Sequence, residues 1–205
     1  GTANQTYTDS GGNEPDGDIT INKSAGTVTL ASNADWNATN QNLFISAGTL
    51  DQGASYTIST GNLTVRAGAT LQSIGTGGLT LAGNVTNDGL INLNGSGTAC
   101  GEVDAISVTS SVSGTQRTWS GSGGYTLYDL TVQDQGGTIT TFSSTNVSGN
   151  LAISSGATFT KGGTLTLDGT TQNVSDANST TQDLGDVATS GTTAVTMTNN
   201  LKVTS

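Results

Sequence analysis

The sequence predicts an all-β fold, and within that class a single-stranded parallel β-solenoid with short strands and turns rich in Gly and Asn. Three observations lead to this prediction: short runs that alternate aliphatic and polar residues, the absence of helical periodicity, and phrases that recur at about the length of one coil. Each coil of such a fold stacks on the one before it and buries an aliphatic edge that it could not bury alone.

Short alternating runs recur along the chain. Examples are TVTL at 27–30, LTV at 63–65, LINL at 90–93 and TLTL at 164–167. Each run places aliphatic side chains on one face and Thr or Asn on the other, which is the pattern of a half-buried strand. No stretch combines helix-forming residues with a 3.6-residue period, so no helix is expected.

Self-similar phrases set the strands at regular intervals. Residues 61–71 are GNLTVRAGATL, residues 149–159 are GNLAISSGATF, residues 41–50 are QNLFISAGTL, and residues 199–205, NNLKVTS, open the same phrase again. In each copy an Asn precedes a strand with inward aliphatic residues. Strand starts about 14 to 21 residues apart match one solenoid coil, and roughly ten coils at about 4.8 Å each would give a rod about 50 Å long.

The competing fold is an antiparallel β-sandwich, which also has short strands and frequent turns. A sandwich needs a bulkier core between its sheets, whereas only 4% of this chain is aromatic and 32% is hydrophobic. A thin coil interior of Leu, Val, Ile and Ala needs few aromatic residues. The single proline, Pro15, also lies outside every expected strand, where it removes no ladder donor. These features favour the solenoid.

One segment interrupts the repeats. Residues 99–124, ACGEVDAISVTSSVSGTQRTWSGSGG, contain the only cysteine, the second tryptophan and a Ser/Gly-rich run. We therefore expect a first solenoid block with an acidic N-terminal loop at 1–98, an interruption or linker at 99–124, and a second solenoid block at 125–205. Cys100 is expected to be buried and inert. The tryptophans, Trp36 and Trp119, are expected to cap a solenoid end or pack beneath a loop rather than stack on sugars.

The charge balance narrows the classes of partner. Fifteen acidic residues against five basic ones give a net charge of −10. Nucleic-acid binding and attachment to anionic membranes need clustered Lys and Arg, whereas the basic residues here are scattered, so neither is expected. No stretch is apolar enough to span a bilayer, so membrane insertion is not expected either. The absence of His and the single Cys remove an imidazole base and any internal disulfide framework. The composition suits an extracellular or cell-surface protein. The scattered basic residues are Lys23, Arg66, Arg117, Lys161 and Lys202.

Several passages resemble the repetitive β-helical segments of large bacterial surface and adhesin-like proteins. They are GNLTVRAGATL, LTLAGNVTNDGLINL and, at 114–137, GTQRTWSGSGGYTLYDLTVQDQGG. Together they cover about a quarter of the chain. The resemblance implies a structural or adhesive role at a cell surface, and it supplies no catalytic residues.

An acidic loop is the best metal candidate in the sequence. Residues 9–18 hold four acids among Gly and Asn, and Ca²⁺ takes carboxylate and carbonyl oxygens on flexible loops of this kind. The spacing of an EF-hand is absent, so a solvated acidic loop is the simpler interpretation. No other cofactor is expected. The candidate calcium ligands are Asp9, Glu14, Asp16 and Asp18.

Catalysis and ice binding are weighed as rival functions. Polysaccharide-active enzymes also use parallel β-helices, but they need aligned carboxylates. The nearest pairs, Asp129 with Asp134 and Asp183 with Asp186, lie in no recognisable motif, so the chain is not expected to be an enzyme. Ice binding would need Thr-x-Thr at the same place on consecutive coils, whereas these motifs are irregularly spaced.

The phrase at the C-terminal end gives the functional prediction. A strand that opens a coil without completing it leaves backbone groups for another strand to pair with, either within a longer solenoid or from a second subunit. We expect a structural subunit or segment of a surface filament or adhesin stalk, either homo-oligomeric and head to tail or joined to other surface proteins. The alternative is a monomeric carbohydrate- or surface-binding module. The expected assembly strand comprises Asn200, Leu201, Lys202, Val203 and Thr204.

Overall fold

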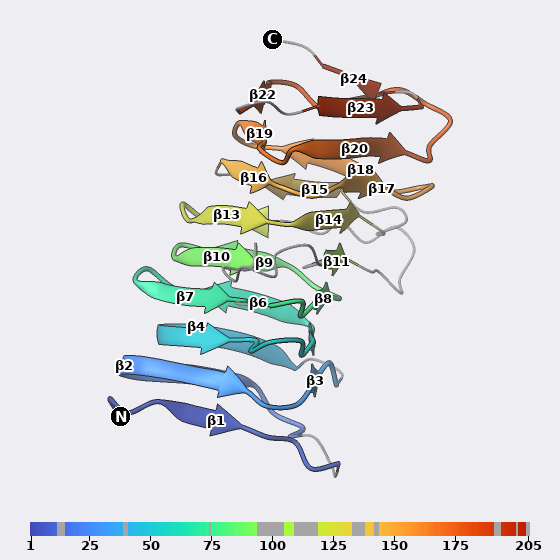
Figure 1. Ribbon diagram of the computed structural model, residues 1–205. Helices are drawn as coiled ribbons and strands as arrows, with labels where there is room; N and C mark the ends of the chain where they lie inside the picture. The colour runs from blue at the N-terminus through green and yellow to red at the C-terminus, as the bar shows by residue number, and fades with distance from the viewer. Residues whose placement is uncertain are drawn as a thin grey trace.

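The chain folds as an all-β parallel solenoid, which confirms the predicted fold class and rules out an antiparallel sandwich (Figure 1). Every strand pair is parallel, because each strand pairs with its counterparts in the coils below and above rather than with its neighbour along the chain. The computed structural model describes residues 1–11, 15–38, 41–73, 75–93, 105–108, 119–132, 138–141, 144–190, 194–199 and 201–203.

Each coil contributes strands to three stacks. Stack I begins with the first halves of β2 (Ile19–Leu30) and β4 (Asn42–Asp51), followed by β6 (Asn62–Val65), β9 (Val85–Asn87) and β12 (Trp119–Ser120). Two further pairs follow at the same place around the coil: β15 (Thr138–Thr141) with β18 (Thr158–Lys161), and β21 (Gln182–Asp183) with β24 (Leu201–Lys202).

Stacks II and III run beside stack I. Stack II consists of β1 (Gln5–Tyr7), the second halves of β2 and β4, β7 (Ala69–Gln72), β10 (Leu90–Leu93), β13 (Gly124–Leu127), β16 (Thr145–Val147), β19 (Leu165–Leu167) and β22 (Val187–Thr189). Stack III consists of β3 (Ala34–Trp36), β5 (Ile58–Thr60), β8 (Leu79–Leu81), β11 (Ala105–Val108), β14 (Asp129–Val132), β17 (Leu151–Ile153), β20 (Thr171–Asp176) and β23 (Ala194–Thr198).

The coils are longer and fewer than the sequence predicted. Stack III has eight strands, so seven turns of chain separate β3 from β23. Along this stack, from the first pair, Ala34–Ile58, to the last, Val174–Met197, paired residues lie 21 to 27 positions apart in the sequence. The expected spacing was about 14 to 21 residues. The prediction of roughly ten coils was wrong because each coil turns three corners, and the recurring phrase spans only one of them.

The recurring phrase forms a strand–corner–strand unit rather than a whole coil. The copy at 41–50 lies in β4 and the copy at 61–71 forms β6 and β7, whereas the copy at 149–159 begins with β17 in stack III. The corner glycine of the phrase has a positive φ in all three copies: +79° at Gly48, +77° at Gly68 and +83° at Gly156. Glycine adopts this conformation without the steric cost that a Cβ would add.

The core is one narrow column of inward side chains. In stack I, Leu43, Leu63 and Val85 lie directly above one another, and all are buried. In stack III, Leu130 and Leu151 do the same. Thr, Ser and Asn occupy the alternate, outward positions, as the period-2 pattern predicted.

Buried amide side chains satisfy the backbone at the corners. The Gln172 Nε2 donates to the carbonyls of Val147 and Gly149 at 2.7 and 2.6 Å, and its Oε1 accepts from the Gly169 N–H at 3.0 Å. Gln41 similarly donates to the carbonyls of Pro15 and Gly17. Ladder bonds are absent where the backbone turns, so these amides supply the partners that buried carbonyls require.

Strands within the expected interruption at 99–124 take part in the stacks. β11 pairs with β8 below and β14 above, and β12 pairs with β9. In stack II, the paired residues Ile91 and Tyr125 are 34 positions apart in sequence, whereas Leu71 and Ile91 are 20 apart. Residues 94–104 and 109–118, with Cys100, lie outside the described residues, and the division into 1–98, 99–124 and 125–205 stays a prediction.

Candidate functional site

The C-terminal face of the solenoid is the main candidate site. It consists of β22, β23 and β24, the last described strands of stacks II, III and I (Figure 1). Within the described ranges, each of these strands pairs with a strand on one side only. Their other edges present backbone groups that can pair with a further parallel strand.

Apolar side chains on this face point toward the core, but no coil among the described residues lies above them. Met197 lies in register above Val174, which is fully buried, yet 43% of Met197 is exposed. Val203 is equally exposed, and Val195 and Leu201 are only partly buried. An inward residue of an inner coil is covered from both sides, so the exposure at this face marks the surface that a further coil would cover.

Part of the expected assembly strand lies on this face. Leu201 and Lys202 form β24, which pairs with β21, and Val203 follows directly. The Lys202 Nζ lies 3.5 Å from the Asp183 Oδ2, and both side chains are about half exposed. Asn200 and Thr204 lie outside the described residues.

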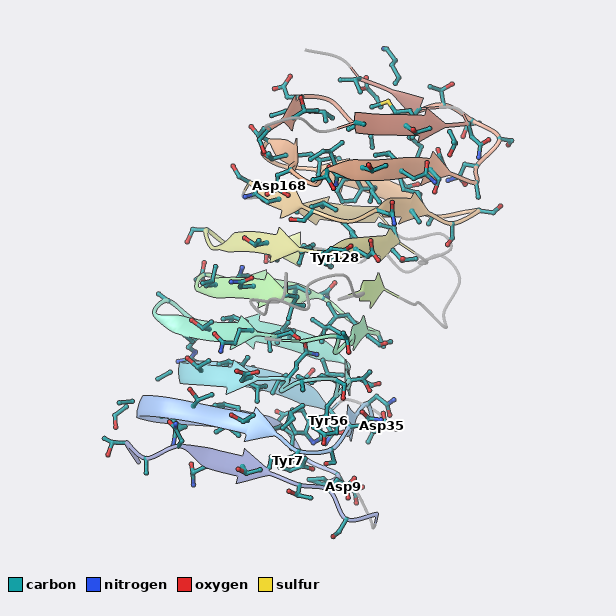
Figure 2. All side chains as sticks on the ribbon, viewed as in Figure 1. Tyr7, Asp9, Asp35, Tyr56, Tyr128 and Asp168 are labelled. Carbon is teal, nitrogen blue, oxygen red and sulfur yellow. The ribbon has the colours of Figure 1, made fainter. Side chains whose placement is uncertain are left out.

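The N-terminal face has a different character. β1 lies beneath the second half of β2, and the buried Lys23 donates from its Nζ to the Ala3 carbonyl at 2.6 Å and the Gln5 Oε1 at 2.9 Å. Tyr7 lies at the end of β1 (Figure 2). Its ring contacts Trp36 edge to face, with ring centroids 5.2 Å apart. The N-terminal segment therefore covers stack II and reaches stack III.

The predicted calcium ligands take part in different local bonds. The Asp9 Oδ1 accepts from the Gly11 N–H at 3.0 Å, and the Asp18 Oδ1 accepts from the backbone N–H and side-chain amide of Asn42 at 3.0 and 2.8 Å. Asp16 is exposed, and Glu14 lies outside the described residues. Among the residues that the structure does describe, no group of three or more Asp, Glu, Cys or His side chains lies close enough together to hold a metal ion. The calcium site stays a prediction.

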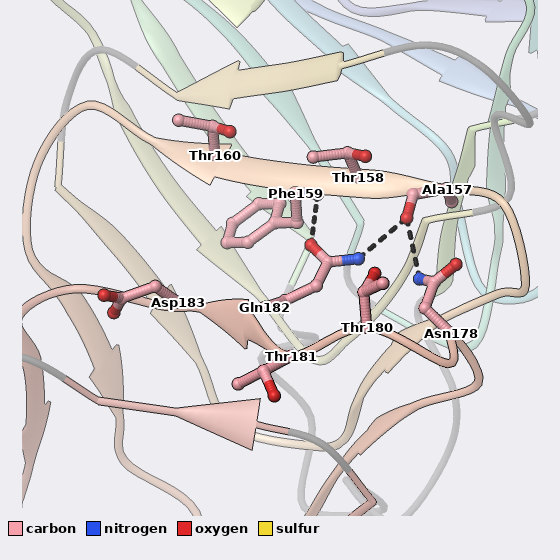
Figure 3. Close-up of a pocket in the computed structure, with 9 residues that line it drawn as sticks. All are labelled: Ala157, Thr158, Phe159, Thr160, Asn178, Thr180, Thr181, Gln182 and Asp183. Carbon is pink, nitrogen blue, oxygen red and sulfur yellow. Dashed lines mark hydrogen bonds between the residues drawn. The ribbon is translucent and has the colours of Figure 1, made fainter.

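A polar groove adjoins the C-terminal face. It has a volume of about 290 Å³ and lies between β18 and the segment at 178–183 (Figure 3). The Gln182 side chain bridges this gap: its Nε2 donates to the Ala157 carbonyl at 2.8 Å, and its Oε1 accepts from the Phe159 N–H at 3.2 Å. The groove is lined by one carboxylate, that of Asp183, and by the hydroxyl groups of Thr158, Thr160, Thr180 and Thr181.

One acid of each pair considered for catalysis has a structural partner. Asp129 accepts a hydrogen bond from the Asn150 N–H, and Asp183 accepts from the Gly185 N–H at 2.8 Å as well as facing Lys202. Asp186 is exposed, and Asp134 lies outside the described residues. Carboxylates of this kind stabilise turns.

The Thr-x-Thr motifs do not align into an extended array. Thr27, Thr49 and Thr70 stack in register on stack II, but Leu90 takes the next position. Beside this row, Thr29 is followed by Asp51 and Gln72. The described threonines therefore lack the repeated pair that ice binding needs.

Two features were not predicted from the sequence. One is an outer ladder in which Asp18, Asn42, Asn62 and Asn84 link successive coils: Asn62 Nδ2 donates to Asn42 Oδ1 at 2.6 Å, and the Asn84 N–H donates to Asn62 Oδ1 at 2.7 Å. The Asn that opens each recurring phrase was the available signal. A ladder of this kind holds neighbouring coils in register.

The other is a buried aromatic pair in the middle of the stack. Trp119 stacks on Tyr125 with centroids 5.4 Å apart, and neither the indole N–H nor the phenol hydroxyl has a hydrogen-bond partner. Burial raises the pKa of Tyr125 well above its usual range, and the neighbouring Asn87 amide opposes this shift only in part. Trp36 and Trp119 are both buried, so neither indole can stack on a ligand.

Comparisons of the chain with protein-family models, with curated proteins and with solved structures found no match. Within its described part, the structure has no helix with the length and apolar character needed to cross a membrane. The solenoid architecture therefore rests on the strand pairing alone, and no comparison links the chain to bacterial adhesin-like proteins.

Proposed function

We propose that the chain is a structural extracellular β-solenoid, a subunit or segment of a cell-surface filament or adhesin stalk, in which coils continue end to end through the terminal strands. It has no catalytic activity of its own in this proposal. Its partners are further copies of the chain or other surface proteins, not nucleic acid and not the membrane interior.

The observation that carries this proposal is the exposed apolar layer of the C-terminal face. Met197 occupies a position that is fully buried one coil below, and the strand beside it offers an open edge. Covering such a layer removes apolar surface from water while the strand edge gains main-chain hydrogen bonds. A further parallel coil supplies both effects at once, because its strand pairs with the open edge and its inward side chains cover the apolar layer.

The proposal is tested by imaging and sedimentation of the purified chain. We expect ordered fibres and a concentration-dependent sedimentation coefficient. Met197→Asp places a charge on the inward side of the face and should leave short monomeric rods. Thr196→Asp, on the outward side of the same strand, is the matched control and should still assemble. Discrete rods of the unmodified chain at every concentration would contradict the proposal.

The polar groove supports a second candidate, a monomeric module that binds carbohydrate or another surface. Its hydroxyl groups and the Asp183 carboxylate suit hydrogen bonds to a sugar, although the Phe159 ring is buried and offers no stacking surface. Binding of a monomeric chain on a glycan array, abolished by Thr160→Val, would favour this candidate. Binding that persists in the variant would count against the groove.

A further inference from the structure

The described strands of the three stacks do not end at the same level on either face of the solenoid: stack I projects at the C-terminal face and is recessed at the N-terminal face. At the C-terminal face, stack I is one strand longer than stacks II and III, because β24 lies above β21 while β22 and β23 have no described strand above them. At the N-terminal face, β1 extends stack II below β2, whereas no described strand lies beneath the first half of β2 in stack I. A projecting strand on one face therefore matches a recess on the other.

The sequences at the step and at the recess belong to one pattern. Asp18-Ile19-Thr20-Ile21, Asn42-Leu43-Phe44-Ile45 and Asn62-Leu63-Thr64-Val65 lie directly above one another in stack I. Residues 200–203, Asn-Leu-Lys-Val, repeat the same order of polar, aliphatic, outward and aliphatic residues. A strand of this pattern placed beneath β2 continues the existing column.

We propose that β24 of one copy pairs in parallel with the first half of β2 in the next copy, with Leu201 opposite Ile19, Lys202 opposite Thr20 and Val203 opposite Ile21. This register rests on the proposed end-to-end assembly and names the two strands that make it.

Burial supports this register. Ile19 and Ile21 are half-buried, and Val203 is 43% exposed, so stacking Leu201 and Val203 beneath them covers apolar surface on both partners. A register shifted by one residue would instead turn Lys202 inward against isoleucine. Alternation of side chains along the strands therefore selects the proposed pairing.

Charge supports it as well. In the proposed register Lys202 lies opposite Thr20, two residues from Asp18. The Asp18 side chain is exposed, and among the contacts described its carboxylate accepts hydrogen bonds only from Asn42. The Lys202 side chain is 57% exposed beside Asp183 and has room for a second carboxylate. The Asp18 carboxylate and the Lys202 ammonium group therefore attract each other across the junction in this register.

Cysteine cross-linking tests the register directly. In a Cys100→Ser background, Thr20→Cys with Lys202→Cys places two outward thiols on adjacent parallel strands, at a separation that a disulfide spans. Within one molecule the two positions are roughly 38 Å apart, eight strand spacings of about 4.8 Å, so only an intermolecular bond can form. Asp35→Cys with Lys202→Cys is the control. Asp35 is exposed on the N-terminal face, as Thr20 is, but it lies in stack III, where the proposed register does not bring it opposite Lys202.

We expect mild oxidation of the first variant to give a ladder of covalent dimers, trimers and larger species on non-reducing gels, well above the control. Fibres in micrographs without such a ladder would overturn the register while leaving end-to-end assembly intact. A chain that stays monomeric by sedimentation before oxidation would overturn both. Circular dichroism of each variant establishes that it has folded.

Discussion

Individual buried side chains set local stability in this thin core. Gln172 and Gln41 hold corner carbonyls that no ladder bond reaches, and Trp119 and Tyr125 bring two polar atoms into the core without partners. A buried polar group without a partner costs free energy, whereas a hydrogen bond that is made contributes about 0.5–1.5 kcal/mol of net stability. The amides therefore stabilise the fold, and the Tyr125 hydroxyl is a cost that packing of its ring offsets.

Tyr125→Phe tests this at the residue scale. The free energy of unfolding at neutral pH should stay unchanged or rise by about 1 kcal/mol, because the orphaned hydroxyl is removed and the ring is kept. Above pH 10, the usual pKa of tyrosine, the unfolded chain releases the Tyr125 proton while the folded chain retains it, so the native protein should lose stability as pH rises. The variant should lose this contribution.

Denaturant unfolding at neutral pH and in steps above pH 10 measures both effects. Tyr128→Phe, at a half-buried position outside the aromatic pair, serves as the control and should keep the alkaline decline. Equal alkaline slopes for the native chain and Tyr125→Phe would show that the buried hydroxyl does not control this behaviour.

At the scale of the element, the unit of construction is one corner with a strand on each side. Gly48 and Gly68 sit at the same corner in successive coils with nearly equal φ. Their surroundings differ. A Cβ at Gly48 would lie 2.8 Å from the Lys23 Cβ and 2.9 Å from the Lys23 carbonyl oxygen, whereas one at Gly68 would meet nothing within 4 Å.

This difference yields a matched pair of variants. Gly68→Ala should cost about 1 kcal/mol, the price of a positive φ alone. Gly48→Ala should cost about 2–4 kcal/mol, because the added methyl group also displaces the β2 backbone. Urea unfolding of both variants gives the comparison, and equal losses would mean that contact between coils adds nothing to the conformational cost.

At the scale of the whole molecule, stability depends on neighbouring coils. Each coil contacts only the one below and the one above, so an outer coil has half the support of an inner one. The C-terminal face carries the partly exposed Val195 and Met197, whereas Ile58 and Leu79 in the inner coils are fully covered. Local opening should therefore start at this face.

Hydrogen exchange measures this gradient. In the unassembled chain, amides of β22, β23 and β24 should exchange faster than those of β5 and β8. In the proposed register β24 pairs with β2 and the β1 strand of the next copy lies above β22, so assembly should slow exchange selectively at β22 and β24. Uniform exchange along the stacks, or protection on assembly that is confined to the inner coils, would contradict both the gradient and the use of this face as a junction.

The sequence by itself determined the alternation of strand residues and the parallel solenoid, because these depend on residues close together in the chain and on phrases that recur along it. It placed Leu201 and Lys202 in the expected assembly strand, which stays a prediction. It did not predict the exposure of Met197, which is evident only from the register with the buried Val174 and from the lack of a described strand above β23. Only the tertiary structure decided that each coil has three strands, that copies of one phrase lie in different stacks, and that Trp119 meets Tyr125. These outcomes depend on the summed lengths of strands and loops around each turn, including the 34-residue step between Ile91 and Tyr125, and no local pattern records that sum.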